Sequence, residues 1–254
     1  MSGAATPAQA AGSDRALADG RIAFYRHPLP VRLTHWVNAL CLWLLLMSGL
    51  QILNAHPALY WGEISTFDQP LLSFGSADGP AFPAWITLPG FQDLAGGRNW
   101  HFFFAWLFVL NGLVYLGYAL RSGRVRNVLA PDREQLRNIG RSLADHLRLR
   151  FPHGDAARGY NVLQKLSYLI VLFGLLPLML LTGLTMSPAM DARLQWLTAL
   201  FGGRQSARTV HFFTATALVA FFLIHVLAVL AAGPLNEMRS IVTGWFVIKP
   251  EKRS

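Results

Sequence analysis

Four long apolar stretches alternate with polar segments along the chain. They cover about residues 36–53, 100–120, 162–186 and 207–232. A helix of roughly 20 apolar residues crosses the hydrocarbon core of a bilayer, so each stretch is long enough to span a membrane. The pattern predicts an all-α integral membrane protein in which four transmembrane helices form a bundle.

Shorter segments show an amphipathic pattern. Residues 131–150 carry apolar side chains at helical spacing, namely Leu136, Ile139, Leu143 and Leu147. We expect this segment to form an amphipathic helix that rests on the inner membrane surface. Residues 190–201 and 241–248 are too short to cross the bilayer, so we expect both to lie at the interface.

The composition supports a membrane protein and limits its partners. Hydrophobic residues make up 53% of the chain and charged residues 14%, whereas a soluble domain has about 25% charged residues. The net charge of +9 comes from arginines between the apolar stretches, which indicates topology and lipid contact rather than nucleic-acid binding. The single cysteine, Cys41, excludes an intrachain disulfide and a Cys-ligated iron–sulfur cluster.

The distribution of basic residues predicts the orientation. The segment 121–158 holds nine arginines, and both terminal segments are also basic. Because positive loops remain in the cytoplasm, we expect a multi-pass protein of the bacterial cytoplasmic (inner) membrane with both termini inside. Residues 1–25 should be a disordered cytoplasmic tail, 26–245 the membrane domain and 246–254 a cytoplasmic tail. The long segment 54–99 then lies outside, either as a docking surface or as a structured cap.

Four histidines lie in or beside the apolar stretches. His211 and His225 share one stretch and are fourteen residues apart, which is about 21 Å along a helix and nearly the same helix face. His35 begins the first stretch at the inner side, and His101 begins the second at the outer side. Matching depths pairs His101 with His211 and His35 with His225. This arrangement suggests two haems stacked across the membrane, each held by two imidazoles.

Other interpretations of these histidines remain open. A single histidine in a span can be a hydrogen-bonded packing residue. Zinc is a further alternative, but it prefers compact tetrahedral sites, and the four stretches contain no Asp or Glu. Two imidazoles between apolar walls suit haem b, and the absence of a Cys-x-x-Cys-His sequence excludes c-type attachment.

An arginine precedes three of these histidines by three residues. Arg32, Arg98 and Arg208 stand in this relation to His35, His101 and His211 and therefore share their helix faces. A guanidinium one turn outside a ligating imidazole can pair with a haem propionate; the alternative is topological anchoring. Five glycines in or near the spans could let a haem or a helix approach closely: Gly49, Gly112, Gly117, Gly174 and Gly183. The remaining histidines, His27, His56, His146 and His153, are interpreted as loop residues.

These residues resemble a known family, the bacterial di-haem b-type cytochromes of the cytochrome b561 class. The resemblance rests on Arg32-Leu-Thr-His35-Trp36, on His101, and on His211 with His225, and it covers roughly residues 26–245. Family members are membrane subunits of nickel–iron hydrogenases, formate dehydrogenases and thiosulfate reductases. The resemblance implies four helices, two b haems, and the four histidines as iron ligands.

The resemblance also implies electron transfer between a periplasmic redox partner and membrane quinone. The partner would be a subunit of a molybdenum or nickel–iron enzyme, or a cytochrome c. We expect the quinone near the inner haem, where Asn161, Gln164 and Lys165 begin the third span; a snorkelling helix end is the alternative. Two other functions remain open: a standalone quinone-linked cytochrome b oxidoreductase, for example one that oxidises superoxide, and a haem-free scaffold or transporter.

Overall fold

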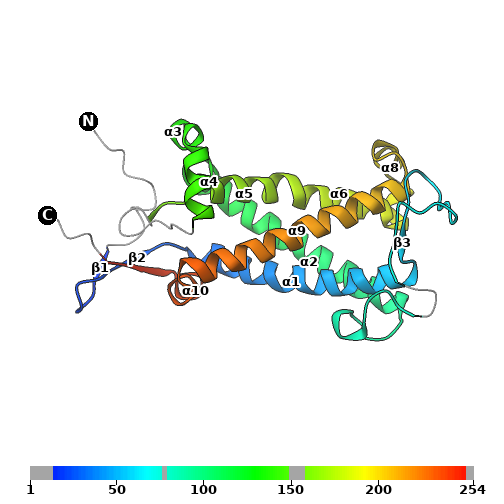
Figure 1. The fold of residues 1–254 in the computed structure, drawn as a ribbon, viewed down its shortest axis with the longest axis horizontal. Helices are drawn as coiled ribbons and strands as arrows, with labels where there is room; N and C mark the ends of the chain where they lie inside the picture. Colours follow the sequence, from blue (N-terminus) through cyan, green and yellow to red (C-terminus); the bar gives the residue numbers. More distant parts are fainter. Residues whose placement is uncertain (1–13, 76–78, 149–157, 250–254) are drawn as a thin grey trace. The chain divides into compact units, whose positions relative to one another are not determined.

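The computed structural model describes residues 14–75, 79–148 and 158–249 (Figure 1). Within these ranges four helical segments are long and apolar enough to cross a membrane. They are α1 (Leu29–Ala55), α2 (Leu94–Arg121), the segment Val162–Met186, and α9 (Arg204–Ala232). The all-α membrane fold expected from the sequence is therefore confirmed. Each helix except the third extends beyond its apolar stretch at the amino-terminal end.

The third span is not a uniform α-helix. It consists of α5 (Val162–Ile170), the π-helical turn η5 (Val171–Leu175) and α6 (Leu176–Met186). Pro177 is the second residue of α6, just beyond the π turn, and has no N–H to donate to the preceding turn. A wider turn at this point accommodates the proline ring without ending the span.

The described chain forms two compact units, and each span contributes to both. Unit 1 contains residues 1–35, 113–171 and 222–254. Unit 2 contains residues 36–112 and 172–221. His35 and His225 therefore belong to unit 1, and His101 and His211 belong to unit 2.

Unit 1 contains a small antiparallel sheet. Its strands are β1 (Arg15–Ala16), β2 (Ile22–Tyr25) and β5 (Trp245–Ile248), in the order β1-β2-β5. Phe24 pairs with Phe246 across β2 and β5, and both side chains are buried together with Ile248. Residues 1–13 and 250–254 lie outside the described residues. The described part of the expected disordered tail, residues 14–25, instead contains the strands β1 and β2, and β2 pairs with the last strand, β5.

Short helices complete unit 1. The turn η3 (Val125–Leu129) follows α2, and α10 (Pro234–Thr243) follows α9. The expected single helix over 131–150 is two helices, α3 (Arg133–Arg137) and α4 (Ile139–Leu147), separated at Asn138. Leu136, Ile139 and Leu143 are exposed, as expected for an amphipathic stripe that faces a membrane.

In unit 2, hydrogen bonds join the segment between α1 and α2 to the start of α9. It contains β3 (Ala58–Leu59), β4 (Leu72–Ser73) and the short 3-10 helix η2 (Ala84–Ile86). The Thr209 hydroxyl donates to the carbonyl of Tyr60, and the N–H of Gly62 donates to the Ser206 hydroxyl at 2.7 Å. The segment expected at the outer interface contains α7 (Pro188–Asp191) and α8 (Gln195–Leu200).

Candidate functional site

Two histidines from different helices face each other in unit 2. His101 lies on α2 and His211 on α9, and their ring centres are 6.3 Å apart with an angle of 61° between the ring planes. The third span separates these residues along the chain, so their approach is a tertiary contact. Both rings are half-buried.

Unit 1 contains a second pair with nearly the same geometry. His35 on α1 and His225 on α9 have ring centres 6.4 Å apart and an angle of 56° between their planes. The single uninterrupted helix α9 therefore supplies one histidine to each pair. The fourteen-residue spacing noted in the sequence makes this possible, since it returns to nearly the same helix face.

Within the described part of the chain, neither pair belongs to a larger cluster of possible metal ligands. Among the described residues, no group of three or more His, Cys, Asp or Glu side chains could hold a metal ion. A bare ion held by protein side chains alone would need such a group. Two imidazoles suffice only for a metal that already carries other ligands, as iron does in a porphyrin.

The three expected propionate-binding arginines occupy different surroundings. Arg32 donates through a terminal nitrogen to the carbonyl of Val242, and its buried Nε has no hydrogen-bond partner among the described residues. Arg98 is exposed, with its guanidinium carbon 5.8 Å from the ring centre of Phe102. Arg208 donates through both terminal nitrogens to main-chain carbonyls of the segment between α1 and α2.

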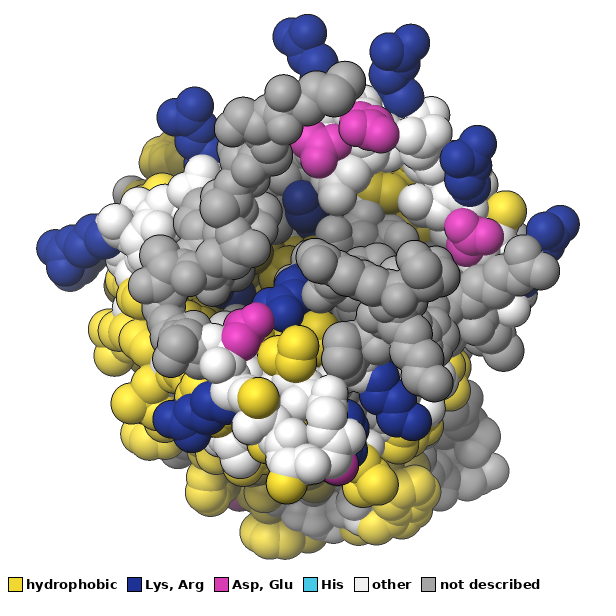
Figure 2. All heavy atoms as spheres, turned by 90° about the vertical axis from the view of Figure 1, so that its left-hand side faces the viewer, with side chains coloured by type: hydrophobic (Ala, Val, Ile, Leu, Met, Phe, Trp, Pro, Cys, Tyr) yellow, Lys and Arg dark blue, Asp and Glu magenta, His cyan; other side chains and the backbone are white. Residues whose placement is uncertain are grey.

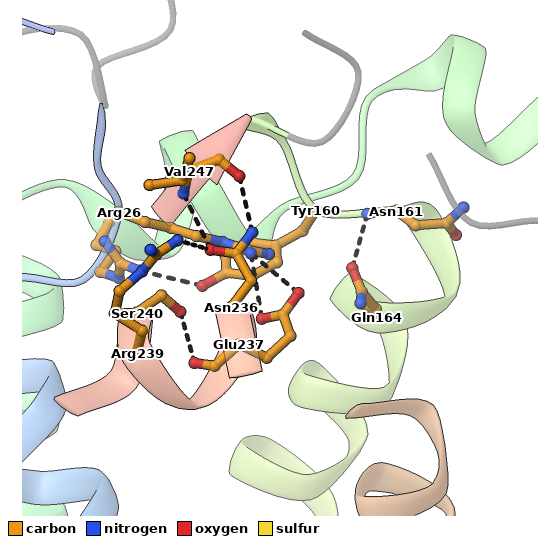
Figure 3. A network of polar contacts seen from close by, with 10 residues as sticks. Arg26, Tyr160, Asn161, Gln164, Asn236, Glu237, Arg239, Ser240 and Val247 are labelled. Carbon is orange, nitrogen blue, oxygen red and sulfur yellow. Dashed lines mark hydrogen bonds and ion pairs between the residues drawn. The ribbon is translucent and has the colours of Figure 1, made fainter. Parts of the chain in front are cut away.

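The residues expected near quinone have local structural partners. Asn161 caps α5: its side chain accepts from the N–H of Leu163, and Gln164 accepts from the N–H of Asn161 (Figure 3). The Lys165 ammonium donates to the carbonyl of Ala130 at 3.2 Å and to the Gln135 side chain at 2.9 Å. These contacts fix the start of the third span.

Figure 3 also shows a polar network beside that helix start. Arg26 forms an ion pair with Glu237 at 3.2 Å, and both side chains are largely shielded from solvent. The Asn236 side chain donates to the carbonyl of Val247 and accepts from its N–H, which ties α10 to β5 (Figure 3). Through these contacts the network holds α10 against the sheet of unit 1.

Two of the other histidines, His27 and His56, lie in bends outside the helices and strands, as expected for loop residues. His27 is buried, and burial together with the nearby Arg26 and Arg124 guanidinium groups lowers its pKa to about 3. Burial and Arg208 also lower the pKa of His56. His146 lies in the helix α4 and not in a loop as expected, although its side chain is not described, and His153 lies outside the described residues.

Sequence reasoning missed several polar contacts within the spans. The Nδ1 atoms of His101 and His211 lie 3.0 Å from the Ser48 hydroxyl and 2.9 Å from the Thr182 hydroxyl. Within unit 2, the Asn111 side chain also donates to that of Asn38 at 2.6 Å. A hydroxyl directly before a glycine in an apolar span was the available signal for the first two contacts.

Two of the five glycines noted in the sequence lie against these histidines. A Cβ at Gly49 would be 3.4 Å from Cε1 of His101, and a Cβ at Gly183 would be 3.5 Å from Cε1 of His211. No described atom would lie within 4 Å of a Cβ at the remaining three, Gly112, Gly117 and Gly174. Gly49 and Gly183 thus allow each ring to lie close to the neighbouring helix.

The fold and the paired histidines define a class, namely a multi-pass membrane protein that presents two imidazole pairs. Comparison with known proteins identifies the family. The family model described as prokaryotic cytochrome b561 matches residues 26–244, and the chain belongs to this family. Membership implies haem b binding and haem-dependent electron transfer across the membrane.

One curated relative is similar over most of its length. It is described as the putative protein-methionine-sulfoxide reductase subunit YedZ1 of Azospira oryzae. The two proteins are 34% identical over 201 residues, which is 79% of this chain and 87% of the relative. No solved structure is significantly similar to the chain.

The residues present fit a haem in each unit. An iron–imidazole bond is about 2 Å long, like other metal–imidazole bonds, so two rings on opposite sides of one iron have centres about 6 Å apart. The observed distances are 6.3 Å and 6.4 Å. The buried Nε of Arg32, which has no partner within the described part of the chain, is a donor from which a propionate carboxylate can accept a hydrogen bond.

Proposed function

We propose that the protein binds two b haems, one in each unit, and passes electrons between an outer redox partner and membrane quinone. The observation that carries this proposal is the pair of ring-centre distances, 6.3 Å in unit 2 and 6.4 Å in unit 1. Each distance would let two imidazoles hold one haem between them. His101 and His211 would hold the outer haem, and His35 and His225 the inner haem.

The protein residues hold and orient these groups. A bound haem supplies an iron that exchanges one electron at a time. The four histidines would provide the axial ligands. The apolar side chains of the spans would exclude water and so stabilise the neutral imidazole that iron requires.

Propionate binding by arginine is proposed in each unit. Arg32 would donate through Nε to a propionate of the inner haem, because none of the residues that the structure describes bonds to this buried Nε. Exposed Arg98 would serve the outer haem. Arg208 already uses one N–H of each terminal nitrogen on main-chain carbonyls, so a propionate would have to accept from its other N–H groups.

We place unit 1 on the cytoplasmic side of the inner membrane. Figure 2 shows Lys and Arg side chains spread over the face that carries β1, β2 and α10, with fewer acidic ones among them. The positive-inside rule then puts both termini in the cytoplasm. Quinone would react on this side, near His35 and His225. Asn161, Gln164 and Lys165 would border it, although each already stabilises the start of α5.

The redox partner would dock on the outer side. Segment 54–99 is long and is anchored to α9, which carries His211, so it offers a fixed surface close to the outer haem. The partner would be a molybdenum or nickel–iron enzyme subunit or a cytochrome c. The relative's description makes an enzyme that reduces methionine sulfoxide in proteins the first partner to test.

Haem content tests the proposal. We expect purified protein, expressed with ample haem supply, to contain two haems per chain and to show a b-type reduced-minus-oxidised spectrum. His35→Ala and His101→Ala should each leave one haem. Colourless protein would favour a haem-free scaffold or transporter, and quinol-dependent activity of the chain without a partner would favour a standalone oxidoreductase.

A further inference from the structure

Two histidines of unit 2 contact the same local pattern on different helices. On α1, Ser48 precedes Gly49; on α6, Thr182 precedes Gly183. The Ser48 hydroxyl lies 3.0 Å from Nδ1 of His101, and the Thr182 hydroxyl lies 2.9 Å from Nδ1 of His211. Both hydroxyl-bearing residues are fully buried. The glycine beside each hydroxyl lets the ring lie near enough to the helix for this contact.

The other hydrogen bonds of the two hydroxyls determine whether the hydroxyl or the imidazole donates. A hydroxyl has one proton, and a serine or threonine in a helix commonly donates it to the carbonyl four residues earlier. Ser48 lies 2.7 Å from the carbonyl of Leu44, and Thr182 lies 2.7 Å from that of Leu178. With its proton used there, each hydroxyl can only accept from the imidazole. The histidine nitrogen must therefore be the donor.

We propose that Ser48 and Thr182 are positioning residues that hold His101 and His211 in the tautomer protonated at Nδ1. In this tautomer Nε2 carries the lone pair and is the atom available to iron. The inference rests on the proposed function of these histidines as ligands of the outer haem. A hydrogen bond from Nδ1–H raises the basicity of the ligating nitrogen, which stabilises oxidised iron. The two hydroxyls therefore lower the reduction potential of the outer haem.

A hydroxyl bonded to its own helix could instead serve helix packing alone, as serine and threonine often do in membranes. The two roles differ in what they change. If the hydroxyl serves helix packing alone, its removal changes the stability of the protein and leaves the electronic state of the haem unaltered. A positioning role changes the reduction potential and the orientation of the imidazole rings on the iron.

Substitutions that remove the hydroxyl test the proposal in the full-length, haem-loaded protein. We would compare Ser48→Ala and Thr182→Val with the hydroxyl-retaining swaps Ser48→Thr and Thr182→Ser. Thr214→Val is a matched control, since Thr214 lies on α9, is buried and donates to the carbonyl of Val210 at 2.7 Å. Optical redox titration would give both haem potentials, and electron paramagnetic resonance would report ring orientation.

We expect the outer-haem potential to rise in Ser48→Ala and in Thr182→Val. A threefold to tenfold change in the reduction equilibrium is expected, where tenfold corresponds to about 59 mV for one electron. The inner-haem potential should stay constant, and the hydroxyl-retaining swaps and Thr214→Val should match the parent protein. The low-spin resonance of the outer haem should shift only in the two hydroxyl-free variants.

Unchanged potentials and resonances in the hydroxyl-free variants would overturn the positioning role. If these variants lose the outer haem while the hydroxyl-retaining swaps keep it, the hydroxyl is required and the proposal holds. If the swaps lose it as well, side-chain shape is responsible and the proposal fails. Failure of the proposed function is a separate result, seen as unchanged haem content in His101→Ala and His211→Ala.

Discussion

The imidazole of His101 on α2 lies with its ring centre 6.3 Å from that of His211 on α9. His35 and His225 repeat this relationship at 6.4 Å. In each unit, a histidine of α9 thus faces a histidine of a helix that is remote in the sequence, α1 in unit 1 and α2 in unit 2. The most direct consequence is that the histidines should act as two independent pairs.

Double substitutions test the pairing. If His101 and His211 share one haem, the variant His101→Ala/His211→Ala should lose one haem, no more than either single variant. His101→Ala/His225→Ala combines members of different pairs and should lose both haems. Haem-to-protein ratios of the purified variants provide the measurement. Loss of both haems from the first variant, or of one from the second, would contradict the pairing.

Arg208 should matter more for the stability of unit 2 than Arg98. Its guanidinium donates to the carbonyls of His56 and Ala58, so Arg208→Ala leaves two carbonyls without these donors. We expect a loss of about 1–3 kcal/mol in the free energy of unfolding. Exposed Arg98→Ala should change it by less than about 0.5 kcal/mol. Thermal unfolding in detergent gives the comparison, and equal effects would argue against the anchoring role.

The close approach of Gly203 to Gly62 predicts a strong effect of an added methyl group. Gly203 has φ of +112°, and a Cβ there would lie 2.5 Å from the carbonyl oxygen of Gly62. Gly203→Ala should therefore destabilise the protein by more than about 2 kcal/mol. Gly202→Ala is the control, because Gly202 also has positive φ but its Cβ would meet only the Ser206 hydroxyl at 3.8 Å. Similar melting temperatures for the two variants would refute the steric argument.

Burial of His27 predicts a loss of stability in acid. Burial, Arg26 and Arg124 lower its pKa to about 3, whereas an unfolded histidine has a pKa near 6.5. Neutral His27 therefore stabilises the fold above pH 6.5, and this stabilisation is lost as the pH falls from 6.5 towards 3. The slope should reach about 1.4 kcal/mol per pH unit. His27→Gln cannot bind the proton, so unfolding curves between pH 7.5 and 5 should depend less on pH; an unchanged dependence would contradict this.

The membrane helices could be predicted because a chain in lipid can adopt few kinds of backbone structure. A backbone in hydrocarbon must satisfy its own hydrogen bonds, so a long apolar stretch has to be helical. The break at Asn138 and the strands of residues 14–25 could not be predicted in this way. Asn138 accommodates a turn between two short helices, and β2 is stable only because β5, more than two hundred residues later, covers it.

The amino-acid sequence by itself determined the four spans, the basic segments between them and the four histidines, because hydropathy, charge and helical spacing are local properties. Only the tertiary structure decided that Ser48 and Thr182 reach the Nδ1 atoms of His101 and His211. It also decided that Arg208 holds the segment between α1 and α2. These contacts join residues far apart in the sequence, and their hydrogen bonds form only when the helices that carry them are packed together.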